Sequence, residues 1–159
     1  QIVRGADFYG PKTPLSFLTV MLFENYVKNK KAQWMISEKF LHSFTYTPDA
    51  GNGLALLGNT PSAYNQVWHT PTDRNVLTGK EFIALTAKEF GIEPSYMVLP
   101  KWMIRMAGMF DKNIKEAVEM LYQSEADYLF DSSKFEKAFG VAPTLYAQGI
   151  AETVKSMKF

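Results

Sequence analysis

Extended segments alternate with helical segments along almost the whole chain, and this alternation restricts the possible folds more than any other feature. Five segments carry the β-branched and aromatic residues typical of strands: residues 1–11, 40–46, 67–69, 96–99 and 128–130. Between and after them, helical spacing of apolar residues predicts helices over 14–30, 47–58, 79–90, 100–123 with a break near Gly108 and Asp111, 132–139, and after Thr144. This order predicts an α/β fold with a few short strands and about six helices.

The signals for helix ends are strongest around residues 78–91. Thr78 and Glu81 have the spacing of a capping box, in which the hydroxyl and the carboxylate each accept a backbone amide of the first turn. Gly91 is placed to end the same helix. Four other residues are expected at helix ends: Gly140 as a C-cap, and Asp49, Asp131 and Thr144 as N-caps. Thr47 and Ser132 are alternatives to the two aspartates.

Length and composition indicate one domain with a substantial core. The chain has 159 residues, of which 47% are hydrophobic, and it contains neither an internal repeat nor a low-complexity linker. The segments 34–36 and 102–103, rich in tryptophan and methionine, are expected in that core.

Charge and cysteine content exclude several classes of partner and site. The 17 basic and 16 acidic residues give a formal net charge of +1, which provides no field to gather nucleic acid or an anionic membrane. No apolar run approaches the roughly 20 residues that cross a bilayer. The absence of cysteine excludes disulfides, thiolate nucleophiles and cysteine-ligated zinc. We expect a cytoplasmic protein with no nucleic-acid or membrane partner.

The chain opens on an extended pattern without an initiator methionine or a leader. A strand needs partners for its backbone N–H and C=O groups, and a domain seldom begins with one. We therefore expect preceding sequence to be missing and the sheet of this chain to be incomplete. An incomplete sheet leaves an open edge and an exposed apolar face, so we expect self-association or a homo-oligomer through that face.

Four short motifs occur in an order that resembles one family. They are Arg4 followed five residues later by Tyr9-Gly10-Pro11, the strand-to-helix stretch His42–Asp49, Asp-x-x-Lys at Asp131–Lys134, and Gly-x-x-Pro-Thr at Gly140–Thr144. Together they resemble the C-terminal part of the extended short-chain dehydrogenase/reductase family, also called the NAD-dependent epimerase/dehydratase family. The resemblance spans nearly the whole chain.

The resemblance implies that residues 1–159 are the substrate-binding part of an NAD(P)-dependent epimerase, dehydratase or reductase whose N-terminal Rossmann part is absent. In this family a tyrosine moves a proton, a lysine four residues later lowers its pKa, and nicotinamide exchanges a hydride with a carbon bearing a hydroxyl or carbonyl. The intact protein is thus expected to bind NAD or NADP. The isolated chain is expected to bind neither and to be inactive.

By their positions in the motifs, six residues are expected at the cleft. The resemblance assigns Gly5 and Ala6 to the cofactor, and Asp7, Phe8, Tyr9 and His42 to the substrate. For Tyr9 an alternative stays open, namely that it is an aromatic residue packed in a turn. The tyrosine, the lysine and the accompanying serine or threonine of catalysis are expected in the missing part.

Asp7 and His42 also indicate what the substrate is not. Relatives that act on nucleotide sugars commonly have asparagine at the first position and arginine at the second, and both side chains address the sugar diphosphate. Aspartate repels phosphate, and a mostly neutral histidine attracts it weakly. We expect a small substrate that bears a hydroxyl or carbonyl and is not a nucleotide sugar.

Two patterns imitate cofactor and catalytic motifs without their context. The glycines at 51, 53 and 58 lack the spacing of a dinucleotide-binding turn and fall inside a predicted helix. The pair Tyr26 and Lys30 has the spacing of the catalytic pair, but it follows the Tyr-Gly-Pro segment, whereas the family's pair precedes it. Neither pattern is assigned a function.

The two histidines offer no strong site either. His42 and His69 lack helical spacing and neighbouring cysteines, so no metal site is expected. His69 and Asp73 could be drawn as two members of a catalytic triad, but no Gly-x-Ser-x-Gly elbow is present, and a satisfied strand histidine is the better interpretation.

Two alternatives to an enzyme part stay open. The chain could be a non-enzymatic module that derives from the same family and binds a metabolite or a protein. It could also be an independent α/β domain that imitates the motifs, in which case its core would close without an open sheet edge.

Overall fold

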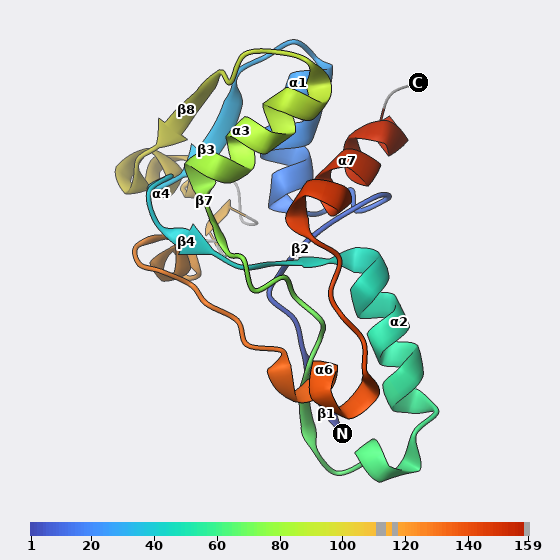
Figure 1. Ribbon diagram of the computed structural model, residues 1–159. Helices are drawn as coiled ribbons and strands as arrows, with labels where there is room; N and C mark the ends of the chain where they lie inside the picture. The colour runs from blue at the N-terminus through green and yellow to red at the C-terminus, as the bar shows by residue number, and fades with distance from the viewer. Residues whose placement is uncertain (111–113, 116–117, 158–159) are drawn as a thin grey trace.

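A computed structural model describes residues 1–110, 114–115 and 118–157 (Figure 1). The expected break near Gly108 is present because a helix ends there, whereas the break expected at Asp111 lies outside the described residues.

The strands form four pairs rather than one continuous sheet. Three pairs are parallel: β1 (Ile2–Arg4) with β6 (Val67–His69), β2 (Asp7–Tyr9) with β5 (Phe44–Tyr46), and β3 (Ala32–Met35) with β8 (Tyr96–Leu99). The fourth, β4 (Leu41–His42) with β7 (Leu77–Thr78), is antiparallel. Each parallel pair joins strands far apart in sequence, as helical crossovers require.

Six α-helices lie in the described part of the chain: α1 (Glu24–Val27), α2 (Thr47–Gly58), α3 (Gly79–Phe90), α4 (Lys101–Gly108), α6 (Ser133–Phe139) and α7 (Tyr146–Met157). A π-helical segment, η1 (Thr19–Phe23), leads into α1, and two short 3₁₀ segments are η2 (Pro61–Ala63) and η3 (Leu121–Ser124). The expected α/β fold with short strands and about six helices is confirmed.

Two predicted strands are each divided in two. Residues 1–11 contain β1 and β2, separated at Gly5 and Ala6, because the two halves pair with different partners. The amide of Ala6 leaves the strand ladder and donates to Thr45 Oγ1 at 3.1 Å. Residues 40–46 divide at Ser43 for the same reason, since β4 pairs with β7 and β5 with β2.

The first predicted helix starts later than its spacing suggested. Pro14 lies in a turn, the helical backbone begins at Phe17, and Leu15 is therefore almost fully exposed. Leu18 and Leu22 are buried as the spacing predicted. The strand β3, which follows this helix, was not predicted.

Local signals at helix ends are confirmed where the partners are close in sequence. Thr78 Oγ1 accepts the amide of Glu81, and Glu81 Oε2 accepts the amide of Thr78. Gly91 and Gly140 end α3 and α6 with φ of 71° and 65°, the left-handed conformation that glycine tolerates best. The N-cap of α6 is Ser132 rather than Asp131, but Asp131 Oδ1 accepts the amide of Ser133 in the first turn at 2.8 Å.

The predicted caps of α2 and α7 are wrong, because Asp49 and Thr144 bind each other across the fold instead of the first amides of their own helices. Asp49 does not cap its own helix; its carboxylate accepts the amide of Thr144 at 2.6 Å and the hydroxyl of Thr144 at 2.9 Å. At the start of α7, the amide of Tyr146 donates to the buried Asp73 at 2.9 Å. These acceptors are 95 and 73 residues away in sequence.

Two hydrophobic cores lie at opposite ends of the molecule (Figure 1). The larger core packs β2, β3 and β5 against η1, α3 and α7 and contains the expected Trp34. The smaller core joins α2, β6 and α6 through Leu57, Trp68 and Phe135. The strand β2 ends in the first core, and β1 contributes Val3 to the second. The opening segment of the chain therefore links the two cores.

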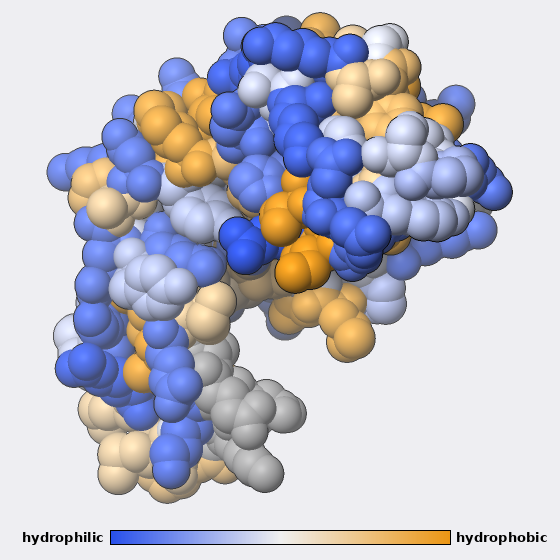
Figure 2. Space-filling model, turned by 90° about the horizontal axis from the view of Figure 1, so that it is seen from below, coloured by the Kyte–Doolittle hydropathy of each residue, from blue (hydrophilic) through white to orange (hydrophobic). Residues whose placement is uncertain are grey.

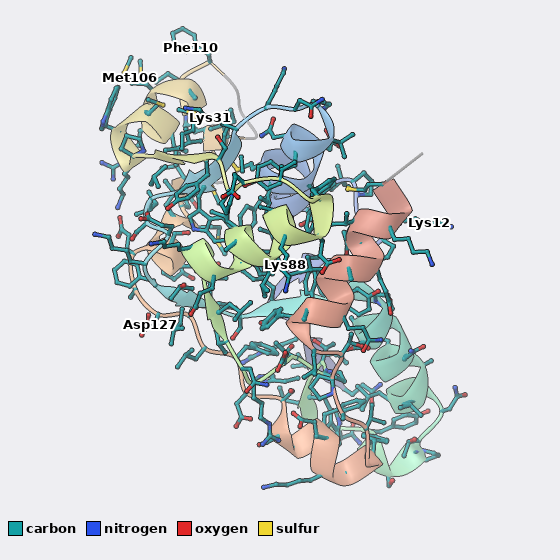
Figure 3. The ribbon with its side chains drawn as sticks, turned by 45° about the horizontal axis from the view of Figure 1, so that its top comes forward. Lys12, Lys31, Lys88, Met106, Phe110 and Asp127 are labelled. Atoms are coloured by element: carbon teal, nitrogen blue, oxygen red, sulfur yellow. The ribbon has the colours of Figure 1, made fainter. Side chains whose placement is uncertain are left out.

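Some large apolar residues lie outside these cores. Trp102, expected in the core, is 61% exposed on α4, and Met106 and Phe110 point outward from the same part of the molecule (Figure 3). Ile2 and Val67 face each other in the register of β1 and β6, and both are exposed. Viewed from below, the surface is hollowed on one side, and apolar residues gather beside the hollow (Figure 2). In the part of the chain that is described, no helix has the length and apolar character to span a membrane.

Candidate functional site

The strand pair β2–β5 brings together two of the residues expected to bind substrate. Asp7 begins β2 opposite Phe44, and His42 precedes β5 by two residues. Asp7 Oδ2 lies 2.9 Å from His42 Nε2, although the residues are 35 positions apart. The Asp7 side chain is 40% exposed and the His42 side chain 9%, so the carboxylate faces solvent while the imidazole lies beneath it.

Asp7 belongs to the lining of an open groove of about 370 Å³. The lining residues are Asp7, Phe8, Thr13, Leu15, Ser16 and Phe17. Thr13 Oγ1 and Ser16 Oγ donate to the backbone carbonyls of Gly10 and Phe8, so both hydroxyls are engaged within the protein. Among these lining residues Asp7 alone carries a charge, and the rest of the lining is the apolar surface of Phe8, Leu15 and Phe17 together with the two engaged hydroxyls. A groove of this kind suits a small ligand with an apolar body and one polar group.

The imidazole of His42 is held between two aromatic rings. It stacks on Phe44 at 4.6 Å between centroids and lies 4.9 Å from the ring of Tyr128 at a tilt of 34°. The amide of Tyr128 donates to the carbonyl of Leu41, and the amide of Ser43 donates to the carbonyl of Tyr128. Sequence reasoning predicted an extended segment at 128–130, but it gave no sign that this segment pairs with His42.

Burial and the Asp7 carboxylate together raise the pKa of Tyr128 above its ordinary value. Both causes act against the phenolate, because a charged oxygen loses hydration on burial and is repelled by a neighbouring carboxylate. The phenol of Tyr128 therefore stays protonated at neutral pH.

Tyr9 does not line the groove but packs in the aromatic core, which favours the alternative interpretation of this residue. The residue is fully buried, and its ring lies 5.4 Å from Tyr46, 5.5 Å from Phe82 and 5.9 Å from Tyr146. Burial is the largest cause that raises the pKa of its phenol, followed by the nearby Tyr146. The aromatic core selects this orientation, and no local sequence signal could have revealed it.

The two residues expected beside the cofactor lie at the junction of β1 and β2. Gly5 is exposed, and a Cβ placed there would meet the ring of Phe8 at 2.7 Å, so glycine permits a close approach between the backbone and the groove wall. Ala6 is buried, and its amide is bound to Thr45. The glycines at 51, 53 and 58 lie inside α2, as predicted, and offer no turn at a helix start.

The remaining histidine, His69, has a backbone hydrogen-bond partner and a stacked ring. His69 Nδ1 lies 2.7 Å from the carbonyl oxygen of Asp131, and its ring stacks on Phe130 at 4.4 Å. Asp73 instead accepts hydrogen bonds from Asn75 and Tyr146. No group of three or more potential metal ligands occurs among the described residues.

Comparison with known proteins gives matches in structure only. No protein-family model and no curated protein matches the sequence. Among solved structures, the chain matches a UDP-glucuronic acid 4-epimerase from Bacillus cereus in complex with NAD with a TM-score of 0.71 and 16% identity. It matches a UDP-glucose 4-epimerase from Thermotoga maritima with UDP-glucose with a TM-score of 0.73 and 15% identity.

A third match is a dTDP-glucose 4,6-dehydratase from Streptomyces venezuelae with NAD bound, at a TM-score of 0.66 and 20% identity. Each match covers 98% of this chain but only 43%, 44% and 42% of the three structures in the order named. The chain therefore spans less than half the length of the structures it matches. The likeness shows that it has the fold of part of NAD-dependent epimerases and dehydratases.

Proposed function

We propose that residues 1–159 are the C-terminal, substrate-binding part of an NAD(P)-dependent epimerase, dehydratase or reductase. Two findings support the proposal: the fold is that of part of such enzymes, and the motifs follow one another in the family's order. In the intact protein, a bound nicotinamide would supply hydride exchange at a carbon bearing a hydroxyl or carbonyl. The tyrosine and lysine of the reaction belong to preceding sequence.

The observation that carries the proposal is the Asp7–His42 pair at the groove. It lies in the segment that the family resemblance assigns to the substrate, and its carboxylate is exposed while the imidazole behind it is buried. A carboxylate held in this way can accept a hydrogen bond from a ligand hydroxyl. Phe8 and Phe17 would cover the apolar part of the ligand and exclude water.

The same pair argues against a nucleotide sugar as substrate. The similar epimerases were solved with UDP-linked sugars, whose diphosphate is anionic. Two like charges about 4 Å apart repel by about 1 kcal/mol in water and by about 4 kcal/mol near a protein surface. A diphosphate at Asp7 would meet this repulsion, so we propose a small uncharged compound with a hydroxyl or carbonyl.

The residues of this chain do not by themselves form a dinucleotide site. The glycines of α2 lie inside a helix, and a Cβ at the buried Gly53 would lie 3.1 Å from Pro71 and 3.4 Å from Phe135. Gly5 and Ala6 would border only the nicotinamide end, through their backbone. We propose NAD or NADP as the cofactor of the intact protein and no catalysis by the isolated chain.

The proposal is tested by expressing the polypeptide encoded with its preceding sequence, beside the 159-residue chain. Purified intact protein should bind NAD or NADP and convert members of a panel of small alcohols, polyols and ketones, and UDP-glucose should be a poor substrate. A reductase would change the nicotinamide absorbance at 340 nm, whereas an epimerase or dehydratase, which is redox-neutral overall, is detected by product analysis. The isolated chain should be inactive. An intact protein that binds neither NAD nor NADP would contradict the proposal and favour a non-enzymatic module.

We also propose self-association through the exposed pair β1–β6. Ile2 and Val67 are register partners there, 56% and 42% exposed, and an uncovered apolar strand pair favours pairing with a second copy. Sedimentation should detect oligomers of the chain. The double substitution Ile2→Ser with Val67→Ser should weaken this association. A clean monomer at high concentration would contradict this.

A further inference from the structure

The site contains one aromatic residue that the motifs did not single out. Tyr128 and Phe44 lie 4.9 and 4.6 Å from the His42 ring and nearly parallel to it, and no contact between their own rings occurs among the described residues. We infer that they lie on opposite faces of the imidazole and clamp it. Phe44 belongs to the large core and is almost fully buried, whereas Tyr128 is half-buried at the border of the site. The clamp therefore has one wall in the core and one partly exposed wall.

The backbone around Tyr128 is fastened to β4 by a short ladder. Residues 42 and 128 form a parallel bridge, and the amide of Tyr128 donates to the carbonyl of Leu41 at 2.8 Å. At the two ends of this ladder, Asp127 Oδ1 accepts the amide of Leu41 at 2.9 Å, and Ser43 Oγ accepts the amide of Phe130 at 3.0 Å. Asp127 lies at the edge of the molecule near β4 (Figure 3). The position of the ring of Tyr128 thus follows from backbone contacts.

A clamped imidazole determines the position of the carboxylate that it holds. With both faces of His42 in contact with rings, its Nε2 edge stays directed at Asp7 Oδ2, 2.9 Å away. In the neutral imidazole the proton then lies on Nε2 and is donated to the carboxylate. A carboxylate that accepts this hydrogen bond keeps its second oxygen for the groove.

We propose that the ring of Tyr128 positions the carboxylate of Asp7 through His42, and that the carboxylate held in this way selects ligands with a hydrogen-bond donor and rejects anions. The inference rests on the proposed function in one respect, because it takes the groove as the side from which the substrate enters. Tyr128 acts as a positioning residue, and Asp7 is the residue that contacts the ligand.

The apolar groove walls add a second requirement. Phe8, Leu15 and Phe17 contribute carbon surface around a single charge, so the ligand should carry an apolar ring or chain beside its donor group. A hydroxyl and an ammonium group share the needed donor, whereas a carboxylate or a phosphate lacks it and carries the wrong sign. Among the uncharged compounds proposed above, the ligand class is therefore a compact alcohol with an apolar body, and an amine serves as a probe of the charge at Asp7.

Three ring compounds that differ only in their polar group test this selection: benzylamine, benzyl alcohol and benzoate. Each is titrated into the isotope-labelled 159-residue chain, and shifts of Phe8 and Leu15 report binding in the groove. Benzylamine should bind about tenfold more tightly than benzoate, with benzyl alcohol between them. Asp7→Asn, which keeps the size of the side chain, should reduce this ratio to about two or less.

The positioning role is tested with a matched set at Tyr128. Tyr128→Phe keeps the ring and should leave the ratio unchanged, whereas Tyr128→Leu and Tyr128→Met remove the ring and should lower it at least threefold. The ¹⁵N shifts of His42 provide a readout that general destabilisation would not move. The Nε2–H tautomer should dominate in the parent chain and in Tyr128→Phe, and it should no longer dominate in Tyr128→Leu and Tyr128→Met. Tyr122→Leu, at a tyrosine 62% exposed, is the control.

The inference is overturned if Asp7→Asn leaves the ratio unchanged, if the probes shift residues outside the groove, or if the folded Leu and Met variants keep both the ratio and the tautomer. These outcomes are separate from the failure of the proposed function. An intact protein without nicotinamide-dependent activity could still prefer benzylamine. An active enzyme without this preference would refute only the inference.

Discussion

The two ends of β2 lie in contrasting surroundings, although they are only two residues apart. Tyr9 is enclosed by the rings of Tyr46, Phe82 and Tyr146, whereas Asp7 is partly exposed on an open groove and touches His42. The closed end gains stability from apolar area removed from water. The open end keeps a charge in contact with solvent and contributes little to stability. One short strand thus connects the part of the molecule that holds the fold to the part that meets a ligand.

Removing a ring from the closed end should have the largest effect. Phe82 is fully buried and contacts the rings of Tyr9, Phe44 and Tyr146, so Phe82→Ala should lower the free energy of unfolding by about 3–5 kcal/mol through lost burial and a cavity. Chemical denaturation followed by circular dichroism measures it. Phe8→Ala, in the groove wall, should cost under about 1 kcal/mol. Equal losses would mean that the groove is also part of the core.

Adding a methyl group at the closed end should have the next largest effect. A Cβ at Gly149 in α7 would collide with the hydroxyl of Tyr9, so Gly149→Ala should destabilise by about 1–3 kcal/mol through overpacking. The matched control is Gly51→Ala in α2, where a Cβ would meet nothing within 4 Å. This substitution should raise the free energy of unfolding by up to about 1 kcal/mol. Thermal melts that move in the same direction for both would contradict the close packing of Tyr9.

A substitution at the open end should hardly change the free energy of unfolding. The Asp7–His42 pair is partly exposed, so Asp7→Asn should change the free energy of unfolding by no more than about 1 kcal/mol while it removes the ligand preference described above. Denaturation midpoints of the two proteins measure the first effect. A loss comparable to that of Phe82→Ala would show that the pair holds the fold together.

The smallest effect is expected at the exposed start of α3. Hydrogen bonds from Thr78 lower the pKa of Glu81 below its ordinary value, so the unfolded chain binds the proton more readily than the folded one. The stabilisation is therefore present above the ordinary glutamate pKa and is lost as pH falls through the lowered one. Unfolding midpoints measured between pH 7 and 3 should lose part of their slope in Glu81→Gln and keep it in Glu93→Gln. An unchanged slope in Glu81→Gln would contradict this contribution.

The extent to which sequence could predict the site differs residue by residue. Asp7 and His42 were singled out from motif positions, and the fold brings them within hydrogen-bond distance. Tyr9 was assigned to the same wall, but the aromatic core turned it inward. Tyr128 was missed because its role arises from pairing with a distant segment. The hydrogen bond between Leu41 and Asp127 in this pairing joins residues 86 positions apart. Motif position indicates a segment, whereas packing decides which of its side chains face the groove.

By itself the sequence determined those features whose causes lie within a turn or two of chain. The capping box of α3, the glycine ends of α3 and α6 and the alternation of strands and helices belong to this class, because their hydrogen bonds and backbone angles are local. Only the tertiary structure decided that Asp49 and Asp73 serve the start of α7, and that Phe44 and Tyr128 clamp His42. Such contacts join residues distant in sequence, and their geometry exists only after the cores have packed.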